Sequence, residues 1–523
     1  MTPFKAPLDD ILFSLNHVAM AGSVTGFDPT LTAEIAHHFA AFAEGEIAPL
    51  DAPGDAQGCR LENGRVHMPE GFAAVYRAYA DQGWPGLTVP EEYGGQGMDA
   101  LLLAVTSEVF SGANHSLQMI TGLVPGAAGV LNRFGTEAQK AKYLPELASG
   151  AALATMALTE PGAGSDLSRI RCRAHDEGGW HISGEKSFIS GGDQDLSAEI
   201  LHLVLARTSD AGVKGLSLFL CPSTRSDGSR NGVQVSRIEE KMGLHASPTC
   251  HVVFDGAEAE LIGGEGQGLA AMFTMMNHAR CDVALQGVAH AARAWDIARR
   301  YGDERTQGRR ADGGAAVLSD HADVARMIDG MDAMALGGRG IAHLCFVAMT
   351  RGDTSDLVAF LTPVAKVHCT EAGVRAAELG MQVLGGYGYL TEYRVEQTYR
   401  DARITQIYEG ANGIHERALV TRLLGGAPGA AFEAFLTQEG VDGTLWQMSR
   451  ATVLDAFDPS PLAHDFMCLT REILLQVVWG RVLAGAEYHG DPERIRRVAG
   501  WARQESDVHM KAAAALLALR AGK

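Results

Sequence analysis

The sequence lacks paired cysteines, an excess of basic residues and any long apolar run. Its eight cysteines stand singly and form no CxxC pair, so we expect reduced thiols, no disulfides and no metal site. The formal net charge of −19 argues against general nucleic-acid binding. No run approaches the roughly 18–20 apolar residues of a membrane-spanning helix, and the acidic start does not read as a secretory signal. These absences predict a soluble, cytoplasmic protein that does not associate with membranes.

What the sequence does contain is a hydrophobic period that changes along the chain. From about 30 to 150, apolar residues recur at spacings of three and four, which predicts helices. Thr136, with Gln139 three residues later, predicts a capping box at the start of one of them. Short alternating runs separated by Gly, Ser, Asn and Asp then predict a small β-barrel or sandwich. The predicted strands lie within 178–190, 201–209, 215–223, 232–240 and 249–257.

The helical period returns near residue 268 and continues to the end of the chain. Long amphipathic segments joined by short links predict an antiparallel bundle, and a Gly/Ala/Pro link at 423–431 precedes a further helical unit. The predicted fold is therefore a multi-domain α+β arrangement. Its expected parts are an N-terminal helical domain (1–153), a middle β domain (154–268), a C-terminal four-helix-bundle domain (269–425) and a C-terminal helical extension (426–523).

Two stretches of the middle region have residues that suit a flat polar ligand. In "MALTEPGAGSD" (156–166), proline and glycines predict a loop after a strand, where Thr159, Ser165 and backbone N–H groups can bind a heterocycle or a phosphate. In "EKSFISGG" (185–192), Phe188 and Ser190 would share one face of a strand. The alternatives are a plain glycine-rich turn and an ordinary core phenylalanine.

A third stretch, "ITQIYEGANGIHERALVTRLLGG" (404–426), places a lone acid, Glu409, between an aromatic residue and Gly410. A glutamate beside a glycine is usually a solvated turn, so this acid alone indicates no function. His415 and the nearby histidines are expected at the surface or as helix caps.

Taken together, these stretches resemble the acyl-CoA dehydrogenase family. "FGTEAQKAKYLPELASG", "VLGGYGYLTEYRVEQTYRDARITQIYEG" and the helical–β–helical order add to the match, which runs from about residue 40 to 425. The start of the chain, the segment 191–208 and the C-terminal extension look most like the larger bacterial branch, which includes dehydrogenases of short thioether-substituted acyl-CoAs. The resemblance implies the acyl-CoA dehydrogenase fold, with FAD between the β domain and the bundle.

The resemblance also implies which residues bind the cofactor. The expected FAD contacts are Thr159, Ser165, Phe188, Ser190, Arg305, Gln382, Gly385, Gly386 and Ala411. Of these, Arg305 and the segment 382–386 would reach the FAD of a neighbouring subunit, which implies a homodimer or tetramer. Ser165 would lie toward the pantetheine or phosphate end of the substrate. Ala411 stands where the family commonly has threonine, so one hydrogen bond to FAD is expected to be missing. The alternative for Arg305 is a surface arginine paired with Glu304.

Glu409 matches the position of the catalytic base in most of the family. It would remove the substrate's α-proton while the β-hydride leaves to the flavin, and its backbone N–H would help to polarise the thioester carbonyl. Burial would raise its pKa above the ordinary value of about 4.3. Asn277, Arg280 and Gly410 are expected to contact the substrate. Some members carry the base near 277–280 instead, where His278 is the plausible substitute.

The resemblance implies an FAD-dependent acyl-CoA dehydrogenase that makes a trans-2-enoyl-CoA and passes electrons to electron-transfer flavoprotein. One alternative is an oxidase or oxygenase of a CoA ester in secondary metabolism, in which reduced flavin reacts with molecular oxygen. A second is an alkylation-response flavoprotein that binds DNA, for which "ERIRRVAGWAR" (493–503) is a local basic run. The acidic composition and the retained Glu409 weigh against this second alternative.

Overall fold

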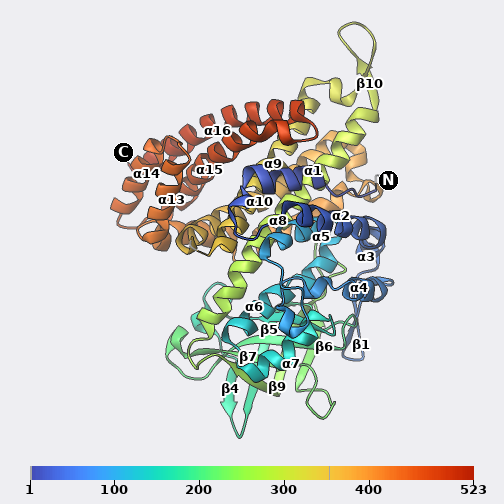
Figure 1. Cartoon of the computed structure of the whole chain (residues 1–523), viewed down its shortest axis with the longest axis vertical. Helices are drawn as coiled ribbons and strands as arrows, with labels where there is room; N and C mark the ends of the chain where they lie inside the picture. The colour runs from blue at the N-terminus through green and yellow to red at the C-terminus, as the bar shows by residue number, and fades with distance from the viewer. Residues whose placement is uncertain (1–2, 353, 523) are drawn as a thin grey trace. The chain divides into compact units, whose positions relative to one another are not determined.

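The computed structural model describes residues 3–352 and 354–522, and the chain divides into two compact units (Figure 1). The helical unit comprises Met1–Glu44, Ala100–Ala113 and Arg280–Lys523. The sheet unit comprises Gly45–Asp99 and Asn114–Ala279. These units take segments from distant parts of the chain, whereas the four expected domains follow chain order, and their boundaries stay a prediction.

The chain passes from the helical unit to the sheet unit inside one helix, α5 (Ala100–Thr121). Asn114 interrupts it with an extended backbone conformation, φ −162° and ψ 93°. The side-chain Oδ1 of Asn114 accepts a hydrogen bond from the backbone N–H of Leu117 at 3.0 Å. Asn114 therefore ends the first half of α5 and caps the second half, as asparagine commonly does at a helix start.

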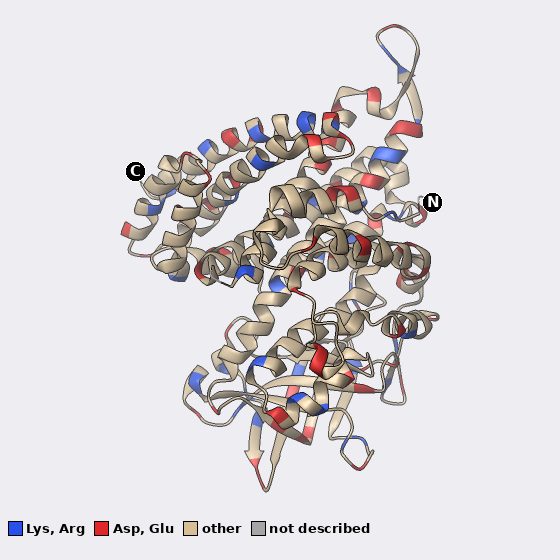
Figure 2. Ribbon diagram, in the orientation of Figure 1, with Lys and Arg blue, Asp and Glu red and all other residues tan. Residues whose placement is uncertain are grey.

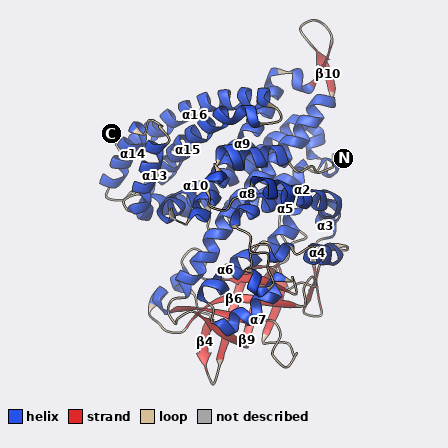
Figure 3. Ribbon diagram, in the orientation of Figure 1, coloured by secondary structure: helices blue, strands red, loops and turns tan. Residues whose placement is uncertain are grey.

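The sheet unit contains a seven-stranded sheet whose pairings close into a ring (Figure 3). Its strands are β3 (Ala152–Ala157), β4 (Arg173–Asp176), β5 (Trp180–Ser190), β6 (Glu199–Arg207), β7 (Leu216–Pro222), β8 (Val233–Ile238) and β9 (Thr249–Ile262). Going around the ring, β4 pairs with β5, β5 with β9, β9 with β7, β7 with β6, and β6 with β4. Strands β3 and β8 extend this ring by pairing with β6 and β9. The predicted strands are confirmed, and the closed pairing makes them a small barrel.

Short helices and a hairpin complete the sheet unit. They are α3 (Asp51–Gln57), β1 (Arg60–Glu62), β2 (Arg65–His67), α4 (Phe72–Asp81), α6 (Val124–Phe134) and α7 (Glu137–Ala148). The predicted capping box at the start of α7 is confirmed. Thr136 Oγ1 accepts from the backbone N–H of Gln139 at 3.3 Å, and Gln139 Oε1 accepts from that of Thr136 at 2.9 Å.

Long helices and several shorter ones form the helical unit, as the returning period predicts. They are α1 (Leu8–Phe13), α2 (Pro29–Phe42), α8 (Gly268–Glu304, of which the part from Arg280 belongs here), α9 (Ala322–Arg351), α10 (Ser355–Leu384), α11 (Val395–Arg403), α12 (Asn412–Ala418), α13 (Ala427–Gln438), α14 (Thr444–Asp455), α15 (Ala463–Gly485) and α16 (Pro492–Arg520). Helix α9 is long and apolar enough to span a membrane by composition. However, 78% of its most apolar window is buried, and it carries the buried Arg339, so it is the core helix of this unit.

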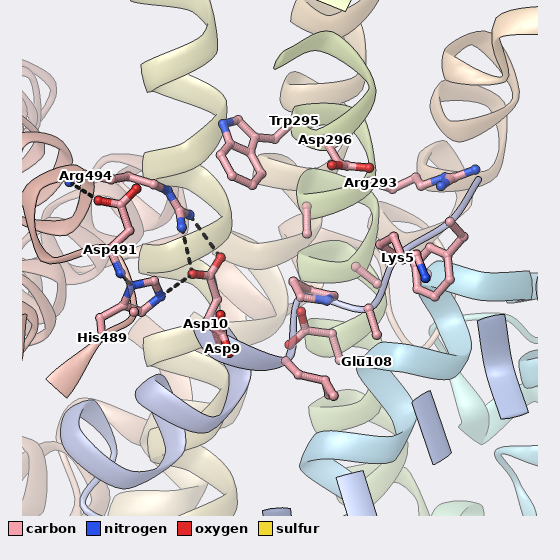
Figure 4. Close-up of a pocket in the computed structure, with 18 residues that line it drawn as sticks. Lys5, Asp9, Asp10, Glu108, Arg293, Trp295, Asp296, His489, Asp491 and Arg494 are labelled. Carbon is pink, nitrogen blue, oxygen red and sulfur yellow. Dashed lines mark hydrogen bonds and ion pairs between the residues drawn. The ribbon is translucent and has the colours of Figure 1, made fainter. Parts of the chain in front are cut away.

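A buried ionic network ties α1 and the first turn of α16 to the core of the helical unit. Arg494 of α16 donates to Asp10 of α1 at 2.9 and 3.0 Å and to Asp332 of α9 at 2.8 and 2.6 Å. His489 Nε2 lies 2.8 Å from Asp10 Oδ1. Figure 4 shows Arg494 and His489 both turned toward Asp10. Deeper in the unit, Arg339 donates to Glu108 at 2.7 Å.

The local basic run of α16 takes part in these and other ion pairs. Arg494 belongs to the network, Arg496 pairs with Glu487, and Arg497 pairs with Asp329. Figure 2 accordingly shows both blue and red positions along α16. The run is therefore a mixed-charge segment of the helical unit and does not form a one-signed basic stripe of the kind that DNA binding requires.

Candidate active site

Glu409 lies in a strained turn between a short 3₁₀ segment (Ile404–Gln406) and α12. Its φ is +54°, a left-handed conformation that costs a residue with a side chain about 1–2 kcal/mol. Gly410 follows with a φ of +92°. A Cβ on Gly410 would meet Nε2 of His415 at 2.9 Å, so both the backbone angle and the space require glycine there. Strain of this kind is concentrated at functional sites, where the surrounding structure enforces it.

Side chains from other helices hold this turn in place. His415 Nε2 donates to the carbonyl oxygen of Glu409 at 3.0 Å. Lys366 Nζ, from α10, donates to the carbonyl oxygen of Gly410 at 2.9 Å and to Oδ1 of Asn412 at 2.8 Å. The hydroxyl of Tyr408 donates to Oε1 of Gln286 on α8. The expectation that His415 lies at the surface is wrong: only 4% of it is exposed, because its ring packs against the Glu409–Gly410 turn.

The electrostatics of the turn suit proton transfer near neutral pH. Burial raises the pKa of the Glu409 carboxyl to about 7, although the positive charges of Arg280 and Lys366 act to lower it. Burial also lowers the pKa of Lys366 to about 7, and the carboxylate of Glu409 opposes that shift. A general base is most effective when its pKa lies near the working pH. Glu409 therefore has the protonation behaviour that an α-proton acceptor needs.

The loop at 158–165 and strand β5 form a second group, in the sheet unit. The backbone N–H of Ser187 donates to the carbonyl oxygen of Thr159 at 2.8 Å. Lys186 Nζ donates to the carbonyl oxygen of Leu158 and to the carboxylate of Glu160, each at 2.9 Å. The structure thus brings together the two stretches that the sequence singled out. Sequence reasoning missed the buried Glu160–Lys186 pair that joins them, although both residues stand inside the quoted motifs.

Phe188 is not a core residue. Its side chain is 63% exposed, and its φ is +59° at a register shift of β5 between Lys186 and Ile189. Ile189 is buried, while Ser190 beyond it is partly exposed, as expected if Phe188 and Ser190 share the outer face. Gly162 has no atom within 4 Å of the position of a Cβ, so the nearby loop is open. An exposed aromatic ring on a strained bulge beside a hydroxyl fits the isoalloxazine ring of FAD.

A third group lies where α8 and α10 end. The guanidinium of Arg305 lies 5.8 Å from the centre of the Tyr387 ring. Gln382, Gly385 and Gly386, in the same turn of the chain as Tyr387, are exposed. The hairpin β10 (Thr306–Arg309) and β11 (Ala315–Val317) starts directly after Arg305. An exposed arginine beside aromatic rings and bare backbone fits a pyrophosphate and its nucleotide.

The lengths of two helices show how far this third group lies from Glu409. Arg280 is electrostatically coupled to Glu409, and Arg305 follows it 25 residues later at the end of α8, which corresponds to roughly 37 Å of helix. On α10, Lys366 contacts the Glu409 turn, and Gln382 follows 16 residues later, roughly 24 Å along the axis. Two independent helices therefore place the two groups at well separated ends of the helical unit.

The remaining expected residues are more dispersed. Asn277 is exposed in the part of α8 that belongs to the sheet unit, and Ser165 is exposed in its loop. Ala411 is exposed at the N-cap of α12 and makes no side-chain capping bond. A cavity of about 440 Å³ lies in the helical unit beside Arg293, Trp295 and Arg494 (Figure 4). None of the residues expected to bind FAD or acyl-CoA is among those that line it.

Comparisons with known proteins agree with this arrangement. Models of the N-terminal, middle and C-terminal domains of acyl-CoA dehydrogenase match residues 32–151, 155–257 and 266–424. The chain is 41% identical to 3-methylmercaptopropionyl-CoA dehydrogenase of Ruegeria pomeroyi, over 80% of this chain and 76% of that protein. It is 32% identical to a broad-specificity linear acyl-CoA dehydrogenase of Mycobacterium tuberculosis, over 79% of this chain and 74% of that protein.

A solved structure extends the similarity of fold to the C-terminal helices. Acyl-CoA dehydrogenase complexed with FAD from Bacillus anthracis superposes with a TM-score of 0.76 at 21% identity, covering 96% of this chain and 92% of that chain. The three domain models together span most of the sequence, in the order that the motifs predicted. The chain therefore belongs to the acyl-CoA dehydrogenase family, as an FAD-dependent oxidoreductase that dehydrogenates acyl-CoA thioesters.

Proposed function

We propose that Glu409 is the base that removes the α-proton of the acyl-CoA as the β-hydride leaves, giving a 2-enoyl-CoA. The observation that carries this proposal is the Glu409 carboxyl itself, held in a strained turn with its pKa raised to about 7 by burial. When bound, FAD supplies the hydride acceptor. The chain's own residues accept the proton, hold the turn and exclude water from the carboxyl.

The neighbours of Glu409 have further roles in the proposed reaction. The charges of Arg280 and Lys366 keep enough of the carboxyl ionised near neutral pH to accept a proton. The backbone N–H of Glu409 donates to the thioester carbonyl, where negative charge develops as the proton leaves. Asn277 and Gly410 contact the substrate. The absence of a hydroxyl at Ala411 leaves FAD with one hydrogen bond fewer on that side.

The decisive experiment replaces the carboxylate without changing its size. Glu409→Gln should fold, bind FAD and bind acyl-CoA, because the amide has nearly the same shape. The rate of flavin reduction, measured by anaerobic stopped-flow bleaching at saturating substrate, should fall by roughly 10²–10⁴-fold or more. His278→Ala, prepared in parallel, should reduce at close to the native rate. Native-rate reduction by Glu409→Gln together with a slow His278→Ala would move the base to His278.

For the substrate we propose a short acyl-CoA with a thioether in the chain, such as 3-methylmercaptopropionyl-CoA. The 41% identity to the Ruegeria pomeroyi enzyme supports this choice. Bleaching should be faster with this thioester than with straight-chain thioesters of similar length. Faster bleaching with long straight-chain thioesters would contradict this choice and make long-chain acyl-CoA the substrate class.

We propose electron-transfer flavoprotein as the electron acceptor and the cytoplasm as the location. After anaerobic bleaching, admission of air should leave the flavin largely reduced while product stays bound. Rapid turnover in air, with labelled oxygen appearing in the product by mass spectrometry, would instead assign an oxygen-using enzyme.

We further propose that each FAD site is shared between subunits of a homodimer or tetramer. Thr159, Phe188 and Ser190 contact the flavin of their own subunit, with Ser165 toward the substrate's pantetheine or phosphate end. Arg305, Gln382, Gly385 and Gly386 contact the FAD of a neighbouring subunit. The support is the length of α8: roughly 37 Å between Arg280 and Arg305 exceeds the length of one extended dinucleotide.

A further inference from the structure

We propose that Lys366 is a positioning residue for the catalytic base: it fixes the turn that carries Glu409 and supplies the positive charge that keeps this carboxyl usable. This inference rests on the proposed role of Glu409 and adds the residue that makes that role possible.

Lys366 holds the turn on the side that follows the base in the chain. Lys366 is fully buried on α10, and its Nζ donates to the backbone oxygen of Gly410 and to Oδ1 of Asn412, at 2.9 and 2.8 Å. These acceptors belong to the first and third residues after Glu409. Asn412 is held from its other side, because its Nδ2 donates to Oγ1 of Thr370, one turn further along α10, at 3.3 Å. The left-handed conformation of Glu409 is therefore enforced from α10.

The hydrogen bonds of Lys366 leave its charge available to Glu409. Another fully buried lysine, Lys186 of the sheet unit, provides the contrast: its Nζ bonds the carboxylate of Glu160 directly, at 2.9 Å, so its charge is paired there. The two acceptors of Lys366 are instead neutral oxygens, a carbonyl and an amide. Burying an ammonium group among neutral acceptors is costly, and burial accordingly lowers the pKa of Lys366 to about 7, while the carboxylate of Glu409 acts to raise it. Lys366 in turn acts to lower the pKa of Glu409, so the charged forms of the two groups stabilise each other.

The titratable groups around Glu409 and Lys366 come from three helices. Arg280 and Asp282 face Glu409 from α8, where Arg280 lowers its pKa and Asp282 raises it. Glu371 acts on Lys366 from the same helix α10 and raises its pKa, while Arg280 lowers it. His415 on α12 stays neutral, since burial lowers its pKa to about 3. Lys366 is thus the cation that contacts the turn by hydrogen bonds while it also acts on the carboxyl by charge.

Three substitutions separate the two contributions. Lys366→Met removes both the donor and the charge, Lys366→Gln keeps a donor without the charge, and Lys366→Arg keeps both. Lys511→Met is the matched control, because Lys511 lies exposed on α16 in a pair with Asp507. Each protein is loaded with FAD, and the rate of flavin reduction at saturating substrate is measured anaerobically from pH 5.5 to 9. Amide hydrogen exchange of the peptide that contains 404–418 is measured on the same proteins.

We expect the apparent pKa of flavin reduction to move upward in Lys366→Met and Lys366→Gln, since Glu409 loses a neighbouring positive charge. It should stay near the native value in Lys366→Arg and Lys511→Met. The limiting rate of Lys366→Met should also fall, by about 10²-fold if the base is displaced by about 1 Å. Exchange of 404–418 should be faster in Lys366→Met than in Lys366→Gln. If Lys366→Met does not retain FAD, the apparent pKa values of flavin reduction in Lys366→Gln and Lys366→Arg still test the proposal.

An unchanged apparent pKa in Lys366→Gln overturns the proposal, whatever the limiting rate. Failure of the underlying base assignment is recognised separately, in Glu409→Gln. If that variant reduces flavin at the native rate, Glu409 is not the base. If it is inactive while Lys366→Gln keeps the native pH profile, Glu409 is the base and Lys366 is a structural lysine only.

Discussion

At the scale of single residues, the chemistry of Glu409 is set by side chains far away in the sequence. Glu409 is half-buried in a turn whose backbone oxygens are held by Lys366 and His415, and it lies near Arg280. Burial and these charges act in opposite directions on its protonation. Their balance leaves a carboxyl that changes charge near neutral pH, where an exposed glutamate would already be fully ionised.

The first prediction is the pH dependence that follows from this balance. Because the base must be deprotonated to accept the α-proton, the rate of flavin reduction should rise with pH and level off above about 7, the value to which burial raises the pKa of Glu409. The measurement is anaerobic stopped-flow bleaching across the pH range at saturating substrate. A rate that is already flat from pH 5 upward would mean that the acting base keeps an ordinary carboxyl pKa.

The sequence indicates a turn at Glu409, and the family resemblance proposes its role, but neither points to the residues that hold the turn. Glu409 and Gly410 stand in a motif whose turn signals can be read locally. Lys366 stands in the stretch "LTPVAKVHCTE", and its signal was a lone charge within an apolar helical run. His415 looked like a surface residue because its burial depends on how α12 folds back on the turn. Local patterns carry no information on such contacts between elements.

At the scale of elements, the long helix α8 runs from Arg280, near the proposed base, to Arg305, the proposed FAD contact. The hairpin of β10 and β11 begins at the end of this helix and follows Arg305 directly. We predict that Arg305→Ala weakens FAD retention by about 1.5–3 kcal/mol, the usual worth of a hydrogen bond to a charged group. The affinity is measured by fluorescence titration of the apoprotein with FAD.

Arg309→Ala provides the matched control for Arg305, because Arg309 is an exposed arginine of the same hairpin. It should retain FAD as the native protein does. Equal affinity in the two variants would make Arg305 an ordinary surface residue and would remove the main support for shared sites.

Elements with strong local signals were predictable, and those without them were not. The capping box of α7 and the alternating strands of the barrel follow from residue patterns, and they form as expected. The hairpin of β10 and β11 was missed because its strands are short and β10 is exposed throughout. The break of α5 at Asn114 and the bulge of β5 at Phe188 were missed because each is enforced by packing and pairing beyond the local sequence.

At the scale of the whole molecule, α1 and the first turn of α16 meet in the ionic network around Asp10. Burial alone would raise the pKa of Asp10, but His489 and Arg494 outweigh burial and hold it well below its usual range. Arg494 also binds Asp332, so one guanidinium serves two buried carboxylates. Chain order alone predicts an N-terminal domain and a C-terminal extension. It does not predict that α1 and α16 belong to the same unit, since that pairing is made only by tertiary contacts.

We predict that Arg494→Met lowers the free energy of unfolding of the helical unit by about 3–5 kcal/mol, because it leaves two buried carboxylates without their shared partner. Arg496→Met on the same helix removes an exposed pair and should cost less than about 1 kcal/mol. Urea unfolding followed by circular dichroism compares the two. Similar midpoints for the two variants would show that the network contributes no more than a surface ion pair.

The left-handed backbone of Glu409 has a consequence for what evolution can select at this position. Glycine would adopt a φ of +54° without strain. It would also remove a carboxyl whose ionisation opposes folding, by an amount that grows between its ordinary pKa of 4.5 and its raised value of about 7 and is present in full above pH 7. Glu409→Gly should therefore give a protein that is more heat-resistant than the native one at pH 8, in differential scanning calorimetry, and catalytically inert. Glutamate at position 409 therefore lowers the stability of the fold while it provides the proposed base. Selection for heat resistance alone would therefore favour glycine over glutamate at this position and remove the proposed base.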